Sequence, residues 1–164
     1  MLMSARLGQN LSIDDIGELK LRVWPGDIDF YPEMNNGRQL SLMDLGRIDF
    51  AIRTGLMRIA HQKGWGFVAA GSSVRYRHRL RPFRQFVLRT RLVGHDSRWF
   101  YFHQQMVRNQ KVCTSALIRG GLTSKSGLVL AQKVLGVMNL KDWHPELPGW
   151  VNAWIEADEL RPDS

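Results

Sequence analysis

Three carboxylates gather in one short polar segment, GDIDFYPEMNNGRQL, which runs from Gly26 to Leu40. Asp27, Asp29 and Glu33 come just before an apolar run whose spacing predicts a helix. The first amides of a helix have no partners inside it and together carry about half a positive charge. If that end of the helix is open, its amides can bind an anion or a developing oxyanion, and a nearby carboxylate stays ionised. Hydrolysis of an activated acyl group would use both components.

The same residue types also suit a purely structural role. Asn35 or Asn36 is a favoured N-cap, and Gly37 leaves the first turn uncrowded. Acidic residues near the start of a helix stabilise it by about 0.3 to 1 kcal/mol each. One or two caps would suffice for one helix, so the number of polar residues favours an additional task. From the residues alone, capping and chemistry both stay open.

The longer segment RVWPGDIDFYPEMNNGRQLSLMDLGRIDFAIRTG resembles the active-site segment of hotdog-fold acyl-CoA thioesterases. It is similar to the 4-hydroxybenzoyl-CoA thioesterase-like branch and to the loop of plant acyl-ACP thioesterases. VRYRHRLRPFRQFVLRTRLVG resembles the second and third strands of such proteins, and PELPGWVNAW resembles their tail. The resemblance implies hydrolysis of an acyl-CoA thioester with no metal or bound cofactor. It also implies a homodimer, or a dimer of dimers, whose active sites form where two protomers join their sheets edge to edge.

The resemblance assigns roles to individual positions. Asp29 matches the second aspartate of the family's D-x-D motif and would be the nucleophile or general base, with Glu33 as its helper. Two alternatives stay open for Glu33: it takes over the role of base, or it only interacts with the helix dipole. The amides around Asn36 and Gly37 fall where the family polarises the thioester carbonyl. Tyr31 and Glu33 stand where plant-type loops have a catalytic Asn and His, so an Asp–His mechanism is not available from this loop.

Substrate contacts are expected from the loop and from an arginine-rich segment. Tyr31 and Asn35 belong to the loop, and Gln39 stands where many relatives have Tyr. Three arginines alternate, so that in a strand they would share one face and suit the phosphates of coenzyme A; they are Arg75, Arg77 and Arg79. The same arginines would also suit nucleic acid, or form the solvated face of an antiparallel sheet.

Periodic patterns indicate the elements that position these residues. ELKLRVW, residues 18–24, alternates polar and apolar side chains as a half-buried strand does. Residues 38–55 predict a long helix enclosed by other elements, because apolar side chains recur three or four apart at Leu42, Leu45, Ile48, Ile52 and Leu56. Four further strands follow through residue 124, and the short turns between them force antiparallel pairing.

The C-terminal part carries two helix candidates, at 131–140 and 149–160. The predicted fold is therefore one α+β hotdog domain over residues 1–164, with a core at about 18–124 and a helical tail at about 130–164. In that fold a long central helix is wrapped by a curved antiparallel sheet of about five strands.

Other polar side chains are expected to be structural. Asp44 on the long helix could support the site from its far side, but a salt bridge with Arg47, three residues on, is the favoured interpretation. His103 is expected to be a hydrogen-bonded structural histidine, and Cys113 a small buried hydrophobe. The five histidines show no metal-binding spacing, and a single cysteine excludes an internal disulfide and a Cys-rich zinc site.

Composition limits the broad class of protein. At 164 residues the chain fits one domain. An excess of 23 basic over 15 acidic residues gives a net charge of +8, which suits nucleic acid, an anionic membrane surface, a phosphorylated small molecule or simply a solvated surface. No apolar run approaches the roughly 18 residues that span a bilayer, and the first residues lack signal-peptide features, so no membrane insertion and a cytoplasmic location are expected.

Two other functions stay open. One is a non-enzymatic basic module that binds acyl-CoA or nucleic acid. The other is a hotdog hydratase or dehydratase, which would need a histidine beside its acid. No histidine lies in the polar loop, which argues against the second.

Overall fold

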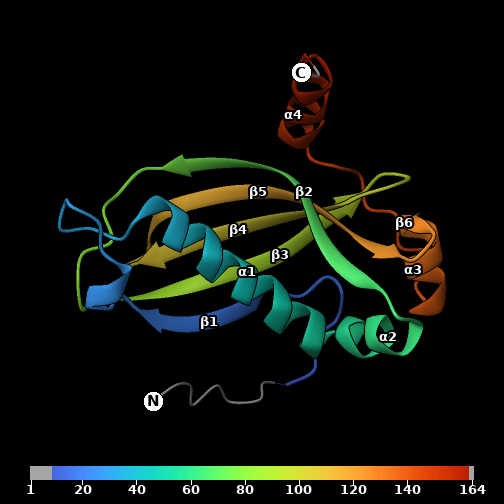
Figure 1. The fold of residues 1–164 in the computed structure, drawn as a ribbon, viewed down its shortest axis with the longest axis horizontal. Coiled ribbons are helices and arrows are strands. Elements are labelled where there is room, and N and C mark those ends of the chain that lie inside the picture. The colour runs from blue at the N-terminus through green and yellow to red at the C-terminus, as the bar shows by residue number, and fades with distance from the viewer. Residues whose placement is uncertain (1–8, 163–164) are drawn as a thin grey trace.

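The computed structural model, which describes residues 9–162, shows a curved antiparallel sheet wrapped around one long helix (Figure 1). The strands are β1 (Gly17–Arg22), β2 (Gly66–Tyr76), β3 (Gln85–His95), β4 (Phe100–Arg108), β5 (Lys111–Ser124) and β6 (Gly127–Val129). The helices are α1 (Asn36–Arg53), α2 (Leu56–Lys63), α3 (Ala131–Val137) and α4 (Gly149–Glu159), and a 3-10 turn, η1, covers Pro25–Asp27. The fold class predicted from the sequence is therefore confirmed.

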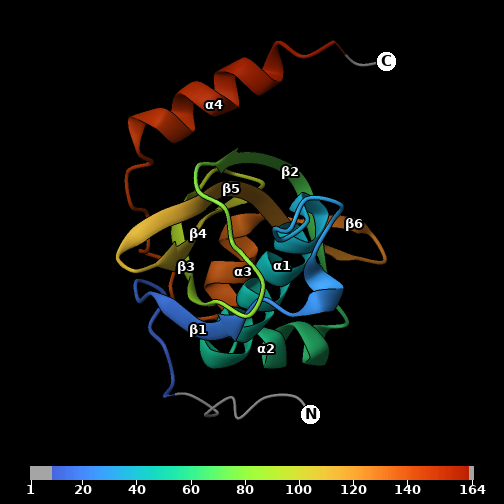
Figure 2. The same cartoon turned by 90° about the vertical axis from the view of Figure 1, so that its left-hand side faces the viewer.

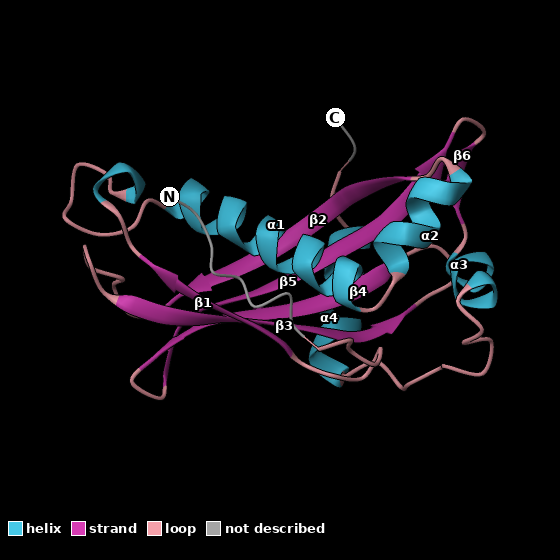
Figure 3. Ribbon diagram, turned by 90° about the horizontal axis from the view of Figure 1, so that it is seen from below, coloured by secondary structure: helices cyan, strands magenta, loops and turns pink. Residues whose placement is uncertain are grey.

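The strand order is β1-β3-β4-β5-β2, with the short β6 beside β5. β1 pairs with β3 along its whole length, and β2 pairs with β5. The first strand of the chain therefore lies at one edge of the sheet and the second at the other edge. The connection between them carries α1 across the concave face of the sheet (Figure 3).

One face of α1 packs against the sheet, and the opposite face does not. The buried residues of the helix are Gln39, Leu42, Met43, Gly46, Phe50 and Ala51. Leu45, Ile48 and Ile52 are 46%, 44% and 52% exposed. The prediction that the whole apolar stripe is enclosed is therefore wrong for these three residues within one chain, because the sheet covers a single side of the helix.

Polar side chains pin α1 to the sheet at its middle. The Gln104 amide nitrogen donates to the Met43 carbonyl and to the Thr90 hydroxyl, both at 2.8 Å. A Cβ on Gly46 would lie 2.7 Å from Thr90 Oγ1 and 2.9 Å from Gln104 Nε2. Gly46 therefore permits a helix-to-sheet distance that a larger residue would prevent. About two turns before Gly46, the Thr114 hydroxyl donates to Gln39 Oε1 at 2.6 Å, which gives Gln39 a structural role.

The C-terminal part of the chain covers other surfaces. α4 lies on the outer face of the sheet, away from α1 (Figure 2). There the Arg119 guanidinium lies 4.7 Å from the centre of the Trp154 ring and pairs with Asp158. α3 and β6 lie at the opposite end of the molecule from the start of α1 (Figure 1). Within residues 9–162, no helix combines the length and the apolar character that crossing a membrane requires.

Candidate active site

The polar segment forms a tight loop that leads directly into α1. Ile28 and Met34 form an isolated antiparallel bridge. Inside it, the Asp29 amide donates to the Glu33 carbonyl at 3.2 Å. The buried Met34 also donates its amide to the Leu80 carbonyl at 2.8 Å. The loop is therefore fixed both to itself and to the connection that follows β2.

Asp27 has a structural role. Its side chain is buried, with 6% of the residue exposed. One oxygen accepts from Arg38 Nε at 2.6 Å, and the other accepts from the Trp24 amide at 2.8 Å. Both oxygens are used, so this carboxylate joins the end of β1 to the first turn of α1 and has none left for a ligand.

Asp29 has a different environment, although it stands only two residues away. Its side chain is exposed, and Oδ1 accepts from the Tyr31 amide at 2.9 Å. Within residues 9–162 its second oxygen has no hydrogen-bond or ion-pair partner. The side chain is thus oriented by one bond while one oxygen remains available.

Glu33 is neutralised by a neighbouring cation. Its carboxylate lies 2.9 Å from Arg79 Nε, and 29% of its side chain is exposed. β2 ends at Tyr76, so the alternation that would place Arg79 on the same face as Arg75 and Arg77 does not continue that far. Arg79 pairs with the loop instead. The three arginines predicted to share one face therefore divide into a pair and a single residue bound to the loop.

Asn35 caps α1. Its Oδ1 accepts from the Gly37 amide at 2.8 Å and from the Arg38 amide at 3.2 Å. Asn36 is the first helical residue, and its amide has no partner among the described residues. The amide that remains open at this end of the helix is therefore that of Asn36, whereas the amide of Gly37 is occupied by the cap.

A basic hollow of about 560 Å³ lies on the outer face of the sheet. Its lining contains two arginines, a lysine and a histidine but no carboxylate; the residues are Arg75, Arg77, His78, Gln105, Lys111, Val112 and Ser115. Ser115 follows Thr114, which points toward α1, so alternation along β5 places the hollow on the side away from α1. The hollow can bind an anion such as a phosphate group.

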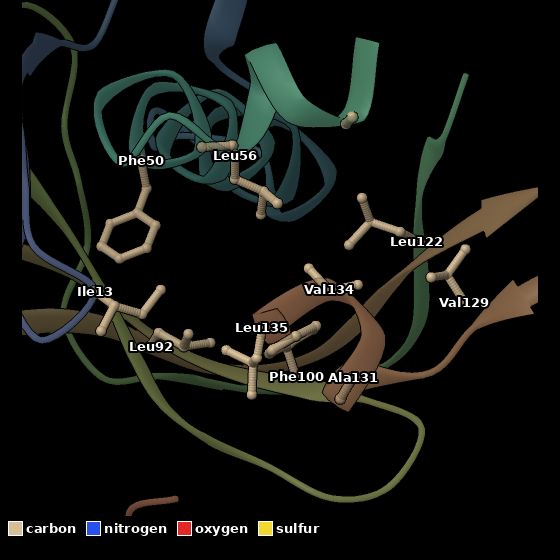
Figure 4. Close-up of a cluster of buried hydrophobic side chains, with 12 residues drawn as sticks. Ile13, Phe50, Leu56, Leu92, Phe100, Leu122, Val129, Ala131, Val134 and Leu135 are labelled. Atoms are coloured by element: carbon tan, nitrogen blue, oxygen red, sulfur yellow. The ribbon is translucent and has the colours of Figure 1, made fainter. Parts of the chain in front are cut away.

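An apolar cavity of about 230 Å³ lies between the C-terminal half of α1 and the sheet. Figure 4 shows much of its wall, including Phe50 and Leu56 from the helices, Leu92 and Phe100 from the sheet, and Leu135 from α3. The wall comes from elements far apart in the sequence, so sequence reasoning did not find the cavity. The only signal was the density of aromatic and branched residues in these segments.

One ion pair lies in the wall of this cavity. Asp44 pairs with Arg47, as the sequence predicted. Arg47 also donates to Gln104 Oε1, and burial lowers the pKa of its guanidinium while Asp44 acts in the opposite direction. Eight residues separate Asn36 from Asp44, which is roughly 12 Å along a helix. Within one chain, Asp44 is therefore distant from the polar loop.

Cys113 is buried as predicted, whereas the hydrogen bond predicted for the His103 ring is wrong, because within residues 9–162 the ring has no hydrogen-bond partner and packs on Trp150 instead. The His103 ring lies edge-on to Trp150 at 5.3 Å, and burial together with Arg91 lowers its pKa. Cys113 is buried, and burial raises the pKa of its thiol, which disfavours the reactive thiolate. In residues 9–162, no three His, Cys, Asp or Glu side chains are placed to share a metal ion.

Comparison with known protein families places the fold and the loop in a wider context. A sequence model of the thioesterase-like superfamily matches residues 23–155, which include the polar loop, α1 and the sheet from β2 onward. The chain is 35% identical over 150 residues to protein THEM6 of Xenopus laevis, covering 87% of this chain and 70% of that protein.

Solved structures share the fold at low sequence identity. The probable thioesterase YbaW of Escherichia coli superposes with a TM-score of 0.69 at 16% identity, covering 76% of this chain and 96% of that one. The Staphylococcus aureus protein SAV2348, solved in complex with CoA, superposes with a TM-score of 0.69 at 10% identity, covering 87% and 96%. These likenesses support the hotdog architecture predicted from the sequence.

Proposed function

This chain belongs to the thioesterase-like superfamily and is a thioesterase, and we propose that it hydrolyses acyl-CoA thioesters with Asp29 as the reacting carboxylate. The observation that carries the proposal is the contrast among the three carboxylates of the loop. Asp27 is buried against Arg38, and Glu33 is paired with Arg79. Glu33 Oε1 also has no partner in the described chain, but its other oxygen is buried beside Arg79. Asp29 is the one of the three that is exposed and, within residues 9–162, has no ion pair; its Oδ2 has no hydrogen-bond partner there.

The open end of α1 supplies the second component. A thioester carbonyl that accepts from the Asn36 amide would be polarised by that amide and by the helix dipole. The negative charge that develops on the carbonyl oxygen during attack would strengthen this bond. Gly37 contributes by its small size, because a Cβ there would lie 3.2 Å from the capping Asn35 oxygen.

Two chemical routes use these groups, and both stay open. In the first, a carboxylate oxygen of Asp29 attacks the thioester carbon, and the tetrahedral intermediate expels CoA as a thiolate. The resulting mixed anhydride is then hydrolysed by water to the free acid and the original carboxylate. In the second, Asp29 takes a proton from a water molecule that attacks the carbonyl directly, so that acid and CoA form without a covalent intermediate. Neutralised by Arg79, Glu33 would position the loop in both routes.

The basic hollow is proposed to bind the phosphates of coenzyme A. Arg75 and Arg77 offer planar donors that match phosphate oxygens, and Lys111 adds a third positive charge. Tyr31, whose residue is 65% exposed next to Asp29, would contact the chain between the phosphates and the thioester. Arg79 is not part of this phosphate site, because it pairs with Glu33 of the loop.

The apolar cavity is proposed to hold the acyl group. A volume of 230 Å³ corresponds to about seven or eight water-sized groups at roughly 30 Å³ each, which suits a medium-length aliphatic chain. Within one chain, however, this cavity borders the C-terminal half of α1, whereas Asp29 precedes its N-terminus. A complete site therefore requires a second protomer.

A homodimer joined at β2 would meet that requirement. Two β2 edges related by a two-fold axis pair antiparallel, which brings the start of one α1 toward the end of the other. β2 is an eleven-residue edge strand that is exposed along most of its length, and the partly exposed Ile48 of α1 lines the apolar cavity together with Phe67 and Val68 of this strand. Such an edge is a template for pairing.

The proposed dimer interface at β2 is tested by sedimentation velocity over a range of protein concentrations. Ile48→Glu should shift the protein to monomers, whereas Leu130→Glu, at a position next to α3 that is 54% exposed against 44% for Ile48, should not. A wild-type protein that stays monomeric at high concentration would contradict the dimer.

The reaction is tested by CoA release from straight-chain and aromatic acyl-CoAs. Removing one oxyanion donor typically costs about 10²- to 10³-fold in rate, and Asp29→Asn should cost at least as much. Asp142→Asn, at an exposed aspartate without an ion pair in the described chain, should keep full activity. Cleavage by folded Asp29→Asn at the wild-type rate would refute the role of Asp29. In water enriched in oxygen-18, label in Asp29 after one turnover would assign the covalent route.

A further inference from the structure

Two aromatic rings and three arginines form an exposed patch at the end of the sheet where β1 stops and β3 begins. Trp24 and Phe83 are 58% and 57% exposed, and the arginines beside them are exposed as well. We call this patch the aromatic platform; it consists of Arg22, Trp24, Arg81, Phe83 and Arg84. Neither the apolar cavity nor the basic hollow includes any of its residues.

Hydrogen bonds hold the platform in one conformation. The Val23 amide donates to the Arg84 carbonyl at 3.0 Å, and the Phe83 amide donates to the Val23 carbonyl at 2.8 Å. Arg22 Nη1 donates to the Phe83 carbonyl at 3.1 Å, and its guanidinium lies 5.9 Å from the centre of the Trp24 ring. Two segments sixty residues apart in the sequence are thereby joined.

The backbone at Phe83 is unusual for an aromatic residue. Its φ angle is +61°, in the left-handed region that bulky side chains rarely adopt. Such a conformation persists only where the surroundings enforce it, and it often occurs at functional positions. Here the enforcing bonds come from Val23 and Arg22, and the result is a ring that extends into solvent although buried positions lie close by at Leu80 and Phe86.

The charge of the platform is not balanced locally. No acidic residue occurs in residues 19–26 or 77–95. Of the nearby carboxylates, Asp27 is buried and paired with Arg38, and Glu18 is paired with Arg89. Within residues 9–162, the platform arginines have no carboxylate within ion-pairing distance. Their positive charge is therefore available to an anionic partner outside the protein.

We propose that the aromatic platform docks the protein on an anionic membrane surface. Tryptophan is enriched at the level of lipid headgroups, because its ring is apolar and its N–H is polar. Arginines beside it can bind lipid phosphates while their stems cover apolar surface. Exposed aromatic and basic residues in one patch thus match both chemical features of an anionic lipid interface.

A membrane fits this patch better than the other partners with matching chemistry. Proteins that bind single-stranded nucleic acid use a basic groove that follows the backbone, whereas the platform occupies two short adjacent turns outside both hollows. A second copy of the chain is proposed to join at β2, and the sheet order places β1 and β3 toward the other edge. The platform would therefore remain exposed in the dimer.

The test is flotation of the full chain with vesicles of phosphatidylcholine alone or with about one third phosphatidylserine. The protein should bind the anionic vesicles, with binding that weakens as salt increases, and should not bind the neutral ones. Each basic residue near an anionic surface contributes about five-fold to binding, so Arg81→Gln with Arg84→Gln should weaken it on the order of 25-fold. Trp24→Ser should weaken it as well.

The matched control carries the same change of charge at the opposite end of the molecule, as Lys125→Gln with Lys133→Gln, and should bind as the wild type does. Hydrolysis of a water-soluble short-chain thioester should be unchanged in the Arg81 and Arg84 variant, so failure of membrane docking is distinguishable from failure of the proposed reaction. Equal loss of binding in the control, equal binding to neutral vesicles, or preferred binding to an oligonucleotide at the same ionic strength would each overturn the proposal.

Discussion

Gly46→Ala should destabilise the protein strongly, although alanine is the better helix former. The added Cβ would lie 2.7 Å from Thr90 Oγ1, 2.8 Å from Leu88 Cδ2 and 2.9 Å from Gln104 Nε2. Overpacking of a core costs about 2 kcal/mol, and displacing the buried amide of Gln104 costs about 2 kcal/mol more. Alanine regains about 1 kcal/mol of helix propensity. The expected net loss of unfolding free energy is therefore about 3 kcal/mol.

Urea unfolding followed by circular dichroism measures this loss. The matched control is Gly136→Ala in α3, where the nearest atom to the new Cβ is the flexible end of Lys141 at 3.8 Å. The control should be neutral or more stable by up to about 1 kcal/mol, because only the propensity gain applies. If Gly46→Ala unfolds at the same or a higher urea concentration than the wild type, α1 does not approach the sheet as closely as described.

Three further predictions concern binding, specificity and pH. Arg75→Gln with Arg77→Gln should raise KM for an acyl-CoA about ten-fold and leave kcat unchanged; the effect is modest because solvent screens these exposed side chains. The matching N-acetylcysteamine thioester lacks the nucleotide, so the variant should hydrolyse it as the wild type does. Ala51→Leu, which adds carbon atoms to the wall of the apolar cavity, should shift the preferred acyl chain toward shorter lengths in a chain-length series. Burial and Arg91 lower the pKa of His103, so the unfolded state binds a proton at this residue at a higher pH than the folded state does. Stability should therefore decline as the pH falls below about 6.5. His103→Gln should reduce that decline in urea titrations, and an unchanged pH dependence would show that His103 does not cause it.

The sequence predicted the elements of the fold well because their patterns are local. The predicted run of four strands ends at residue 124, where β5 ends, and the predicted long helix differs from α1 by two residues at each end. The short β6 was missed, since three residues carry no clear period. Burial on α1 was mispredicted at Ile48 and Ile52, because periodicity identifies apolar positions but not the number of sides from which a helix is covered.

The candidate site was harder to predict because partners distant in the sequence decide the role of each polar residue. Asp44 and Arg47 are neighbours on one helix turn, so their salt bridge followed from spacing. The pair formed by Glu33 and Arg79 joins residues forty-six positions apart, and no local rule indicates it. Alternation suggested instead that Arg79 stays with the other arginines, which requires the strand to continue past Tyr76.

Most polar groups of the loop have a structural role, and the polar groups that have no partner identify its reactive part. Asp27 joins β1 to α1 through Trp24 and Arg38, and Asn35 satisfies two amides of the helix. These structural bonds use both oxygens of Asp27 and the side-chain oxygen of Asn35. A segment that served only to start a helix would need nothing else. Glu33 lies beside Arg79, whereas among the described residues one oxygen of the exposed Asp29 and the amide of Asn36 are left without partners. They are a potential nucleophile or base and a potential oxyanion donor in one loop. Hydrolysis of a thioester requires this pair of groups, and capping does not.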